Sequence, residues 1–472
     1  MITAKLTAQI LKELRYSPTE GQETAVEGLV SYLSGNGSEI FLLTGYAGTG
    51  KTSLIASLVR SMEGHRYRTV LMAPTGRAAK VFSAFAGKPA YTIHKLIYRQ
   101  KRSVGGFGEF ELDRNLARST LFLVDEASMI SDQSLDLSPF GSGRLLEDLI
   151  KYVFSGPSCK LVLIGDEAQL PPVGFDRSPA LDPSMLATFG FPVSHCSLTE
   201  VVRQEEGSMI LSNATNLRMR LAKDDFGFPD LKAEQGSAVE SIGGDSLIDT
   251  LQRSYDTAGL DETLVVCRSN KQANRYNEGV RNMILWKDNE ISQGDLVMVV
   301  TNNHIWLKDS PEVDFIANGD ILEVMRTRQY RELYNFRFCE MTLRFTDYRQ
   351  FEFDALVLLD TLRSESASLD RDSMRNLFAE VSADYQHMKG KKHRSDAIRQ
   401  DPYFNALQIK FAYAMTCHKA QGGQWKHVYI DQGWVEESKL DKEYYRWLYT
   451  AVTRATERVY LVNFKAEFLT PQ

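Results

Sequence analysis

Cysteine is scarce in this sequence and follows no metal-binding pattern. The 472 residues include five cysteines. They are scattered along the chain, and no two of them form a CxxC pair. Zinc ribbons and iron–sulfur clusters are therefore not expected, and a reducing cytoplasm is the simplest location for an odd set of thiols.

Long apolar runs are also missing. The sequence has no stretch of about 18 apolar residues, the length that a membrane-spanning helix needs. Its first 16 residues alternate charged and apolar side chains, whereas a secretory signal has a continuous apolar centre. We therefore expect neither a membrane partner nor export.

The sequence also lacks an excess of positively charged residues. The net charge is −6, which argues against a protein that coats nucleic acid through bulk charge but allows a locally positive groove. The two basic runs are RQKR at 99–102 and KGKKHR at 389–394. Each is either a solvated charge run or part of such a groove. A chain of this length predicts two to four domains.

The hydrophobic pattern predicts an α/β fold with parallel sheets. In the first third, short apolar runs that read as buried strands alternate with helical spacing, as in a parallel sheet covered on both faces. A second α/β region starts near residue 198. The expected strands lie at 39–44, 69–73, 120–124 and 160–165, and then at 263–267, 428–431 and 458–463.

Two insertions interrupt this alternation. The stretch 98–118 carries several glycines and predicts a small hairpin. The stretch 321–404 alternates like antiparallel strands and ends in a charged helical arm at 370–399. The predicted domains are residues 1–197 with the hairpin, residues 198–320 joined to 405–472, and the β-rich insertion 321–404.

A phosphate-binding loop is predicted at GYAGTGKT, residues 45–52, which follows a strand and opens a helix. Glycines let the backbone wrap a phosphate, and the loop N–H groups and the helix N-terminus face the anion. Lys51 should reach the β- and γ-phosphates of ATP and Thr52 should ligate Mg²⁺. The alternative is a glycine turn that caps a helix. The other residues expected to line the nucleotide are Gly45, Ala47, Gly48, Thr49, Gly50 and Ser53.

Carboxylates follow the strand at 120–124. Asp125 is expected to hold the Mg²⁺ ion and Glu126 to orient and deprotonate water, since ligands of open α/β sheets lie at the carboxyl ends of strands. The alternative for Asp125 is a helix cap. Gln169 follows the next strand and precedes two prolines, so it is either a sensor of the γ-phosphate or part of a turn.

Together these segments resemble superfamily 1 helicases, within them the RecD-like and Dda-like group. The motifs occur in the family's order, and the resemblance runs from about residue 17 to residue 462. The matching segments are APTGRAAK at 73–80, TIHKLI at 92–97, LTEVVRQ at 198–204, GDLVMVVTNN at 294–303 with NGD at 318–320, YAMTCHKAQGGQW at 413–425 and YTAVTRA at 449–455.

The resemblance implies two RecA-like domains with ATP between them and an SH3-like insertion in the second. It implies that Arg203 and Arg454 touch the γ-phosphate, although an arginine in such a segment is more often a surface salt bridge. It assigns Gln22 to the adenine, where it would otherwise be an exposed helix residue, and Gly422 to the nucleotide site.

The resemblance also implies a path for single-stranded DNA across both domains. His94 and His418 are expected in polar loops, with capping as the alternative role. Phe107 and Phe110 of the hairpin either stack on bases at a fork or pin the hairpin to the body. The residues assigned to DNA are Thr75, Gly76, Lys80 and His94 in the first domain, and Asn303, Thr416, His418 and Lys419 beyond it.

The function expected from the resemblance is an ATP-dependent DNA helicase that uses Mg²⁺, moves 5′→3′ on single-stranded DNA, opens forked duplex DNA and works as a monomer. One alternative is a DNA-stimulated ATPase that remodels protein–DNA complexes without unwinding. Another is a P-loop regulatory switch. DNA repair, recombination, replication restart and mobile-element biology all fit the sequence equally well.

Overall fold

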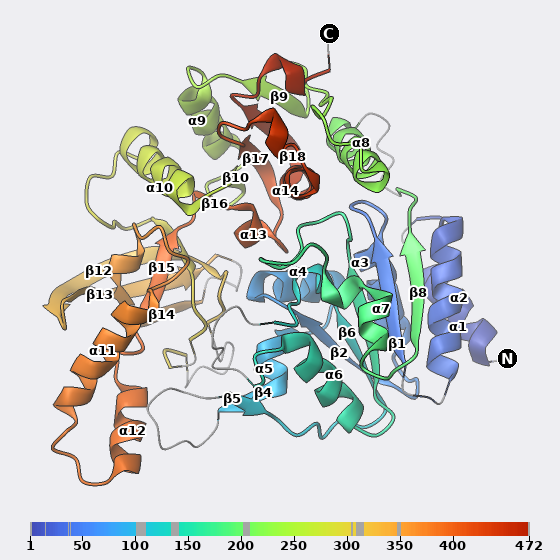
Figure 1. The fold of residues 1–472 in the computed structure, drawn as a ribbon, viewed down its shortest axis with the longest axis horizontal. Coiled ribbons are helices and arrows are strands. Elements are labelled where there is room, and N and C mark those ends of the chain that lie inside the picture. Colours follow the sequence, from blue (N-terminus) through green and yellow to red (C-terminus); the bar gives the residue numbers. More distant parts are fainter. Residues whose placement is uncertain are drawn as a thin grey trace.

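The computed structural model describes residues 2–14, 16–35, 37, 39–100, 110–133, 141–201, 208–303, 305–307, 316–346 and 351–470. These residues form two lobes with parallel sheets and a barrel beside them (Figure 1). Within the described part of the chain, no helix is long and apolar enough to cross a membrane.

The first lobe has a six-stranded sheet in the order β3-β2-β6-β7-β1-β8, and every pairing in it is parallel. Its strands are β1 (Ile40–Gly45), β2 (Arg68–Ala73), β3 (Ala90–Thr92), β6 (Thr120–Val124), β7 (Lys160–Gly165) and β8 (Val193–Leu198). The position of β7 between β1 and β6 brings the loops after these three strands together at one edge of the sheet.

Both faces of this sheet are covered, because successive side chains of a strand point to opposite sides. In β6, Leu121 and Leu123 join one hydrophobic cluster, whereas Phe122 and Val124 join the other. The first face carries α1 (Ile2–Glu13), α2 (Glu20–Ser34), α3 (Lys51–Ser61) and α4 (Gly76–Ala86). The second carries α5 (Ile93–Ile97), α6 (Leu145–Ser155), α7 (Pro183–Ala187) and the 3₁₀ turns Ala127–Met129 and Pro179–Leu181.

The predicted hairpin is confirmed at its base. β4 (Tyr98–Gln100) pairs antiparallel with β5 (Phe110–Leu112), with Tyr98 opposite Leu112. The tip, residues 101–109, lies outside the described residues, and Phe107 lies with it.

The second lobe has a five-stranded parallel sheet in the order β16-β10-β17-β18-β9. The strands are β9 (Val239–Ile242), β10 (Thr263–Cys267), β16 (Ala414–Thr416), β17 (Trp425–Asp431) and β18 (Ala455–Val462). The helical elements are α8 (Met209–Lys223), α9 (Leu247–Thr257), α10 (Asn270–Gly279), the π-helical turn Val280–Ile284, α13 (Cys417–Ala420), α14 (Lys442–Val452) and the 3₁₀ turns Glu437–Lys439 and Ala466–Phe468.

The β-rich insertion is a closed barrel of five strands, and it is wider than the predicted 321–404. The first and last strands lie outside those bounds, because a barrel removes its open edges only when its end strands also pair. The strands are β11 (Leu296–Val299), β12 (Ile321–Leu333), β13 (Phe336–Phe345), β14 (Glu352–Leu358) and β15 (Leu407–Phe411).

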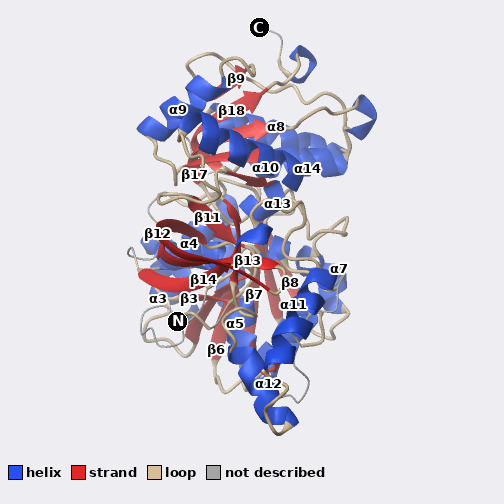
Figure 2. Cartoon of the chain, turned by 90° about the vertical axis from the view of Figure 1, so that its left-hand side faces the viewer, coloured by secondary structure: helices blue, strands red, loops and turns tan. Residues whose placement is uncertain are grey.

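The charged arm is helical, as predicted. After the 3₁₀ turn Leu359–Thr361, Asp370 caps α11 (Arg371–Asp384), and α12 (Lys391–Gln400) follows. Leu377 and Ile398 of these helices pack with Phe338 of the barrel in one small cluster. Both views show the arm extending away from the second lobe (Figures 1 and 2).

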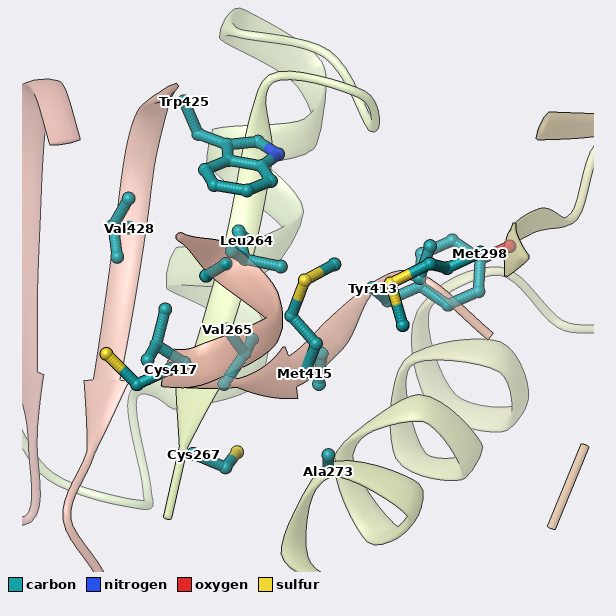
Figure 3. Packing of buried hydrophobic residues seen from close by; sticks show 14 of the residues in the cluster. Leu264, Val265, Cys267, Ala273, Met298, Tyr413, Met415, Cys417, Trp425 and Val428 are labelled. Carbon is teal, nitrogen blue, oxygen red and sulfur yellow. The ribbon is translucent and has the colours of Figure 1, made fainter. Parts of the chain in front are cut away.

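The barrel and the second lobe share one continuous core. Tyr413 lies between β15 and β16, fully buried beside Met298 of the barrel (Figure 3). Its hydroxyl donates to the buried Asp295 carboxylate at 2.9 Å, and Arg281 pairs with the same carboxylate at 3.1 Å. This shared core fixes the barrel to the lobe in which it is inserted.

Candidate active site

The loop after β1 has the geometry of a phosphate cradle. Gly48 and Gly50 adopt φ angles of 80° and 79°, which side chains disfavour, and α3 begins directly after Gly50. The Lys51 ammonium donates to the carbonyl oxygens of Gly45 at 2.5 Å and Tyr46 at 2.8 Å. The lysine therefore lies across the loop whose N–H groups would face a phosphate.

Two carboxylates follow β6. Glu126 has a φ of 53°, a left-handed conformation that costs a non-glycine residue energy and that concentrates at functional sites. Its N–H donates to the Asp125 carboxylate at 2.9 Å. Burial, and then the Glu126 charge, raise the pKa of Asp125 to about 7, while Lys51 opposes the shift.

Asp125 and Thr52 fit a magnesium ion. Mg²⁺ prefers oxygen ligands, and a hydroxyl with a carboxylate is a common protein contribution to its shell. Burial and the neighbouring Glu126 carboxylate disfavour the ionised form of Asp125. A bound cation would stabilise that ionised form. Among the described residues, there is no cluster of three His, Cys, Asp or Glu side chains that could hold a metal by itself.

Gln169 follows β7. In the sheet, β7 lies between β1, which precedes the phosphate loop, and β6, which precedes the two carboxylates. Its side chain is 7% exposed, and its Oε1 has no hydrogen-bond partner in the described part of the chain. A buried amide oxygen without a partner is costly and often marks a ligand or water position. This supports the sensor hypothesis over the turn hypothesis.

The second lobe reaches this site through Tyr449 of α14, which sequence reasoning missed. The Tyr449 hydroxyl accepts the N–H of Ala47 in the phosphate loop at 2.9 Å and donates to the Asp166 carboxylate at 2.7 Å. It is 1% exposed, so both bonds are shielded from water. Tyr449 opens the segment YTAVTRA, but its partners depend on tertiary structure alone.

Two further bonds join the lobes next to Gln169. Leu170 donates its N–H to the Thr450 hydroxyl at 2.9 Å, and its carbonyl accepts the Gln421 amide at 2.8 Å. The segment that carries Gln169 is therefore held by the second lobe on both sides of its backbone.

Gln22 lies beside the phosphate loop and is 3% exposed, so it is not the exposed helix residue of the alternative. Its Nε2 donates to the Thr49 carbonyl at 3.1 Å, and its Oε1 accepts the Thr19 N–H at 3.2 Å in a capping box. Both ends of the amide are used within the protein here. The structure thus gives Gln22 a role in holding the loop.

Arg454 is 4% exposed and is held by its own lobe. Its guanidinium donates to the Thr450 and Gly423 carbonyls at 3.0 and 3.2 Å. Arg203 lies outside the described residues. Gly422, which was expected at the nucleotide, instead packs against α4 of the first lobe, since an added Cβ would lie 2.8 Å from the Ala78 Cβ.

Gly76 and Lys80, two of the first-lobe residues assigned to DNA, contact the segment before β12. Thr75 caps α4 by accepting the Ala78 N–H at 3.2 Å. A Cβ at Gly76 would lie 2.5 Å from the Ala317 Cβ. Lys80 forms an ion pair with Asp320 at 3.1 Å. The first lobe and the barrel are therefore in direct contact here.

Of the other residues assigned to DNA, Lys419 contacts the same segment. The Lys419 ammonium donates to Asn318 Oδ1 at 3.1 Å, and burial lowers its pKa. Thr416 precedes α13 as its N-terminal cap residue. Asn303 is 9% exposed, and its side chain bonds to the Asn405 carbonyl and the Ile305 N–H, both at 2.9 Å, so it holds the barrel's own backbone.

The two histidines are not in polar loops. His94 lies on α5 with its ring 5.8 Å from the Tyr98 ring, and burial lowers its pKa to about 4. His418 lies on α13, where burial also lowers its pKa. Both histidines lie in short helices that follow a strand. These helices are too short to show hydrophobic periodicity in the sequence.

Phe110 packs against the first-lobe core, which favours the pinning role.

Comparison with known proteins gives matches over most of the chain. Residues 18–226 match the AAA domain family, and residues 411–462 match the UvrD-like helicase C-terminal domain. The ATP-dependent DNA helicase Dda of Enterobacteria phage T4 is 24% identical over 94% of this chain and 99% of its own length. The ATP-dependent RecD2 DNA helicase of Deinococcus radiodurans is 24% identical over 95% of this chain, which spans 49% of that relative.

Solved structures agree on the fold. A Pif1 helicase from work on unwinding at forked DNA superposes with a TM-score of 0.50 at 15% identity, covering 97% of this chain and 95% of its own. Bacteroides Pif1 bound to single-stranded DNA gives a TM-score of 0.50 at 16% identity, with the same coverage. At this level of identity, the likeness is one of fold.

Two parallel-sheet lobes that meet at a phosphate loop, with a barrel inserted in the second, define an ATP-hydrolysing enzyme of the helicase type. Within that class, the chain resembles the RecD-like and Dda-like helicases of superfamily 1B. The two RecA-like lobes and the SH3-like barrel predicted for it are confirmed.

Proposed function

We propose that this helicase moves 5′→3′ on single-stranded DNA and uses Mg-ATP hydrolysis to separate the strands of forked duplex DNA. The observation that carries the proposal is the bond of Tyr449 to the Ala47 N–H, because it joins the second lobe directly to the phosphate loop. Changes at the nucleotide can therefore move one lobe against the other.

At the nucleotide, Lys51 and the loop N–H groups bind the β- and γ-phosphates. Glu126 takes the proton of the attacking water as the water oxygen bonds to the γ-phosphorus and the bond to the bridging oxygen breaks. ADP and orthophosphate leave, and Glu126 returns its proton to solvent. Thr52 and Asp125 would hold a Mg²⁺ ion, which would neutralise charge on the phosphates.

Arg203 and Arg454 are proposed to stabilise the γ-phosphate from the second lobe, and in related phosphoryl transfer such arginines contribute about 10³–10⁵ in rate. Arg454 would exchange its bonds to the Thr450 and Gly423 carbonyls for the phosphate. Gln169 would accept a hydrogen bond from the attacking water through its unpaired Oε1.

The proposed DNA path runs over the first lobe at Thr75, Gly76, Lys80 and His94 and over the second at Thr416, His418 and Lys419. Small hydroxyls, backbone N–H groups and a few cations suit a motor that must bind and release each phosphate. Gly76 of the first group and Lys419 of the second both contact the segment 317–320. DNA held there would sense any change in the spacing of the lobes.

A fluorescent fork assay tests this proposal. Substrates with only a 5′ tail or only a 3′ tail are mixed with the full chain, with and without ATP and Mg²⁺. We expect unwinding of the substrate with the 5′ tail only, and only with ATP. DNA-stimulated ATP turnover without unwinding on either fork would instead assign the chain to translocation or protein remodelling, and turnover that ignores DNA would assign it to a regulatory switch.

A further inference from the structure

A cavity lies beside the proposed catalytic groups, and Tyr46 of the phosphate loop is in its lining. Its volume is about 410 Å³. We call it the rear cavity and define it by Ser128, Gln169, Arg177, Arg218, Lys442 and Arg446 in its lining. Neither Lys51 nor Glu126 lines it.

The position of the rear cavity separates it from the nucleotide's main binding surface. α3, which carries Lys51 and Thr52, packs on one face of the first-lobe sheet. Leu181, which lines the cavity, belongs to the cluster on the opposite face. The cavity therefore lies behind the strand tips, on the side of α7.

The inner end of the cavity adjoins the site of hydrolysis. Ser128 is two residues beyond Glu126, and Gln169 is the proposed γ-phosphate sensor. They are 1% and 7% exposed, and neither Ser128 Oγ nor Gln169 Oε1 has a hydrogen-bond partner in the described part of the chain. Two unpartnered buried oxygens in one wall indicate a position for a polar ligand.

The outer end is rich in cations from both lobes. Arg177 of the first lobe is exposed, and Arg446 of the second lobe is half-buried and donates to the Asp176 carbonyl beside it. Burial, and then the Arg177 charge, lower the pKa of Arg446, so the two guanidinium groups are close enough to repel each other. Arg218 stacks on the Tyr46 ring at 4.4 Å and completes the wall near the phosphate loop.

Most of the acidic groups in the lining are already engaged. Asp166 accepts from the Tyr449 hydroxyl and the Ala168 N–H, and Asp182 caps α7 by accepting from the Ser184 N–H at 2.9 Å. Glu167 lies near Arg177 and Arg446 and offsets part of their charge. The four cationic side chains of the lining still outnumber its three acidic ones. The lining thus favours an anion with several oxygens, which guanidinium groups recognise through paired hydrogen bonds.

We propose that the rear cavity receives the orthophosphate cleaved from ATP and is its route to solvent. The inference rests on the proposed ATP hydrolysis. Because α8 and α14 of the second lobe form one wall and the first lobe forms the other, separation of the lobes widens the route. Release of orthophosphate then follows lobe opening, while ADP leaves on the α3 side.

The test compares cleavage and release in the full chain with single-stranded DNA bound. Chemical quenching measures ATP cleavage, and a fluorescent phosphate-binding protein measures release in stopped flow. Arg177→Ala is the main variant, because its side chain is exposed. Arg446→Ala is the second, and Arg375→Ala, on α11 and 71% exposed, is the matched control.

We expect cleavage at the wild-type rate and release slowed about tenfold in both cavity variants, the loss expected for one charge-assisted contact. Added inorganic phosphate should inhibit steady-state turnover less in these variants than in the wild type or the control. Arg177→Lys should restore part of the release rate. The inference is overturned if both variants release orthophosphate as fast as they cleave ATP, or faster than the wild type does. If the wild-type chain cleaves no ATP, the proposed function fails instead.

Discussion

Lys80 of α4 and Asp320, the residue before β12, form an ion pair across the boundary between the first lobe and the barrel. Their charged groups are 3.1 Å apart, and their side chains are 10% and 2% exposed. The Lys80 ammonium also lies 5.3 Å from the Phe345 ring centroid. A residue assigned to DNA therefore also docks the barrel, and the two roles must be separated by experiment.

Lys80→Ala should destabilise the protein, because it leaves the Asp320 carboxylate buried without its cation. The expected loss is about 3–5 kcal/mol of the free energy of unfolding, measured by urea denaturation. The double variant Lys80→Ala/Asp320→Asn removes the buried charge and should regain most of that stability.

DNA binding then distinguishes the two roles of Lys80. If Lys80 contacts a phosphate, the double variant should still bind single-stranded DNA more weakly, and its salt slope should be shallower by about 0.7. A double variant that regains stability and binds DNA like the wild type would leave Lys80 with barrel docking alone.

Tyr449→Phe should uncouple the lobes at the phosphate loop. The change leaves the Ala47 N–H and the Asp166 carboxylate without their bridge. We expect a loss of about 1–3 kcal/mol in stability and a lower kcat for DNA-stimulated ATP hydrolysis, with KM for ATP nearly unchanged.

Tyr444→Phe is the matched control for this prediction. Tyr444 lies on the same helix and is as deeply buried, but its hydroxyl donates to Gln432 within the second lobe at 2.6 Å. It should lose stability without the fall in kcat. Equal kcat values for the two variants would show that the Tyr449 bridge has no part in coupling.

Lys51→Ala should lower ATP turnover by at least about 10²-fold, the scale of losing one group that stabilises developing charge. Folding should change by only about 1 kcal/mol, since the Lys51 ammonium bonds to two loop carbonyls that water can reach once it is gone. A colorimetric phosphate assay and circular dichroism measure the two effects, with Lys271→Ala on the surface as control. A folded variant with normal turnover would refute the nucleotide site.

The lowered pKa of His94 predicts that the folded protein loses stability in acid. Burial lowers its pKa to about 4 in the folded chain, against about 6.5 in an unfolded one. Between these values the unfolded chain binds more protons, so the free energy of unfolding rises with pH from about 4 to 6.5 and this contribution is complete above that window.

Urea unfolding at pH 5 and pH 7.5 measures this contribution. His94→Gln should shrink the difference between the two pH values, whereas His387→Gln, at an exposed position, should leave it unchanged. The same difference in both variants would contradict a neutral His94.

The strands and the catalytic motifs could be predicted because their signals are local. Buried runs such as 120–124 carry only apolar residues, and the phosphate loop needs glycines at fixed positions. The barrel's outer strands fell outside the predicted bounds because β11 and β15 are short runs whose pairing is decided by closure. Tyr449, Asp320 and Gln421 were missed because their partners are far away in sequence. His94 was misplaced because five helical residues give no period to read.

The insertion of the barrel between β10 and β16 has a consequence for how the chain assembles. These strands are neighbours in the second-lobe sheet, yet the whole barrel and its arm lie between them in sequence. The sheet can be completed only when the chain after the barrel and arm pairs with β10. Formation of the sheet is therefore slow and depends on contacts between residues distant in sequence. Truncation before Ala414 would strip that sheet of β16, β17 and β18 together, so the second lobe has no autonomous N-terminal half.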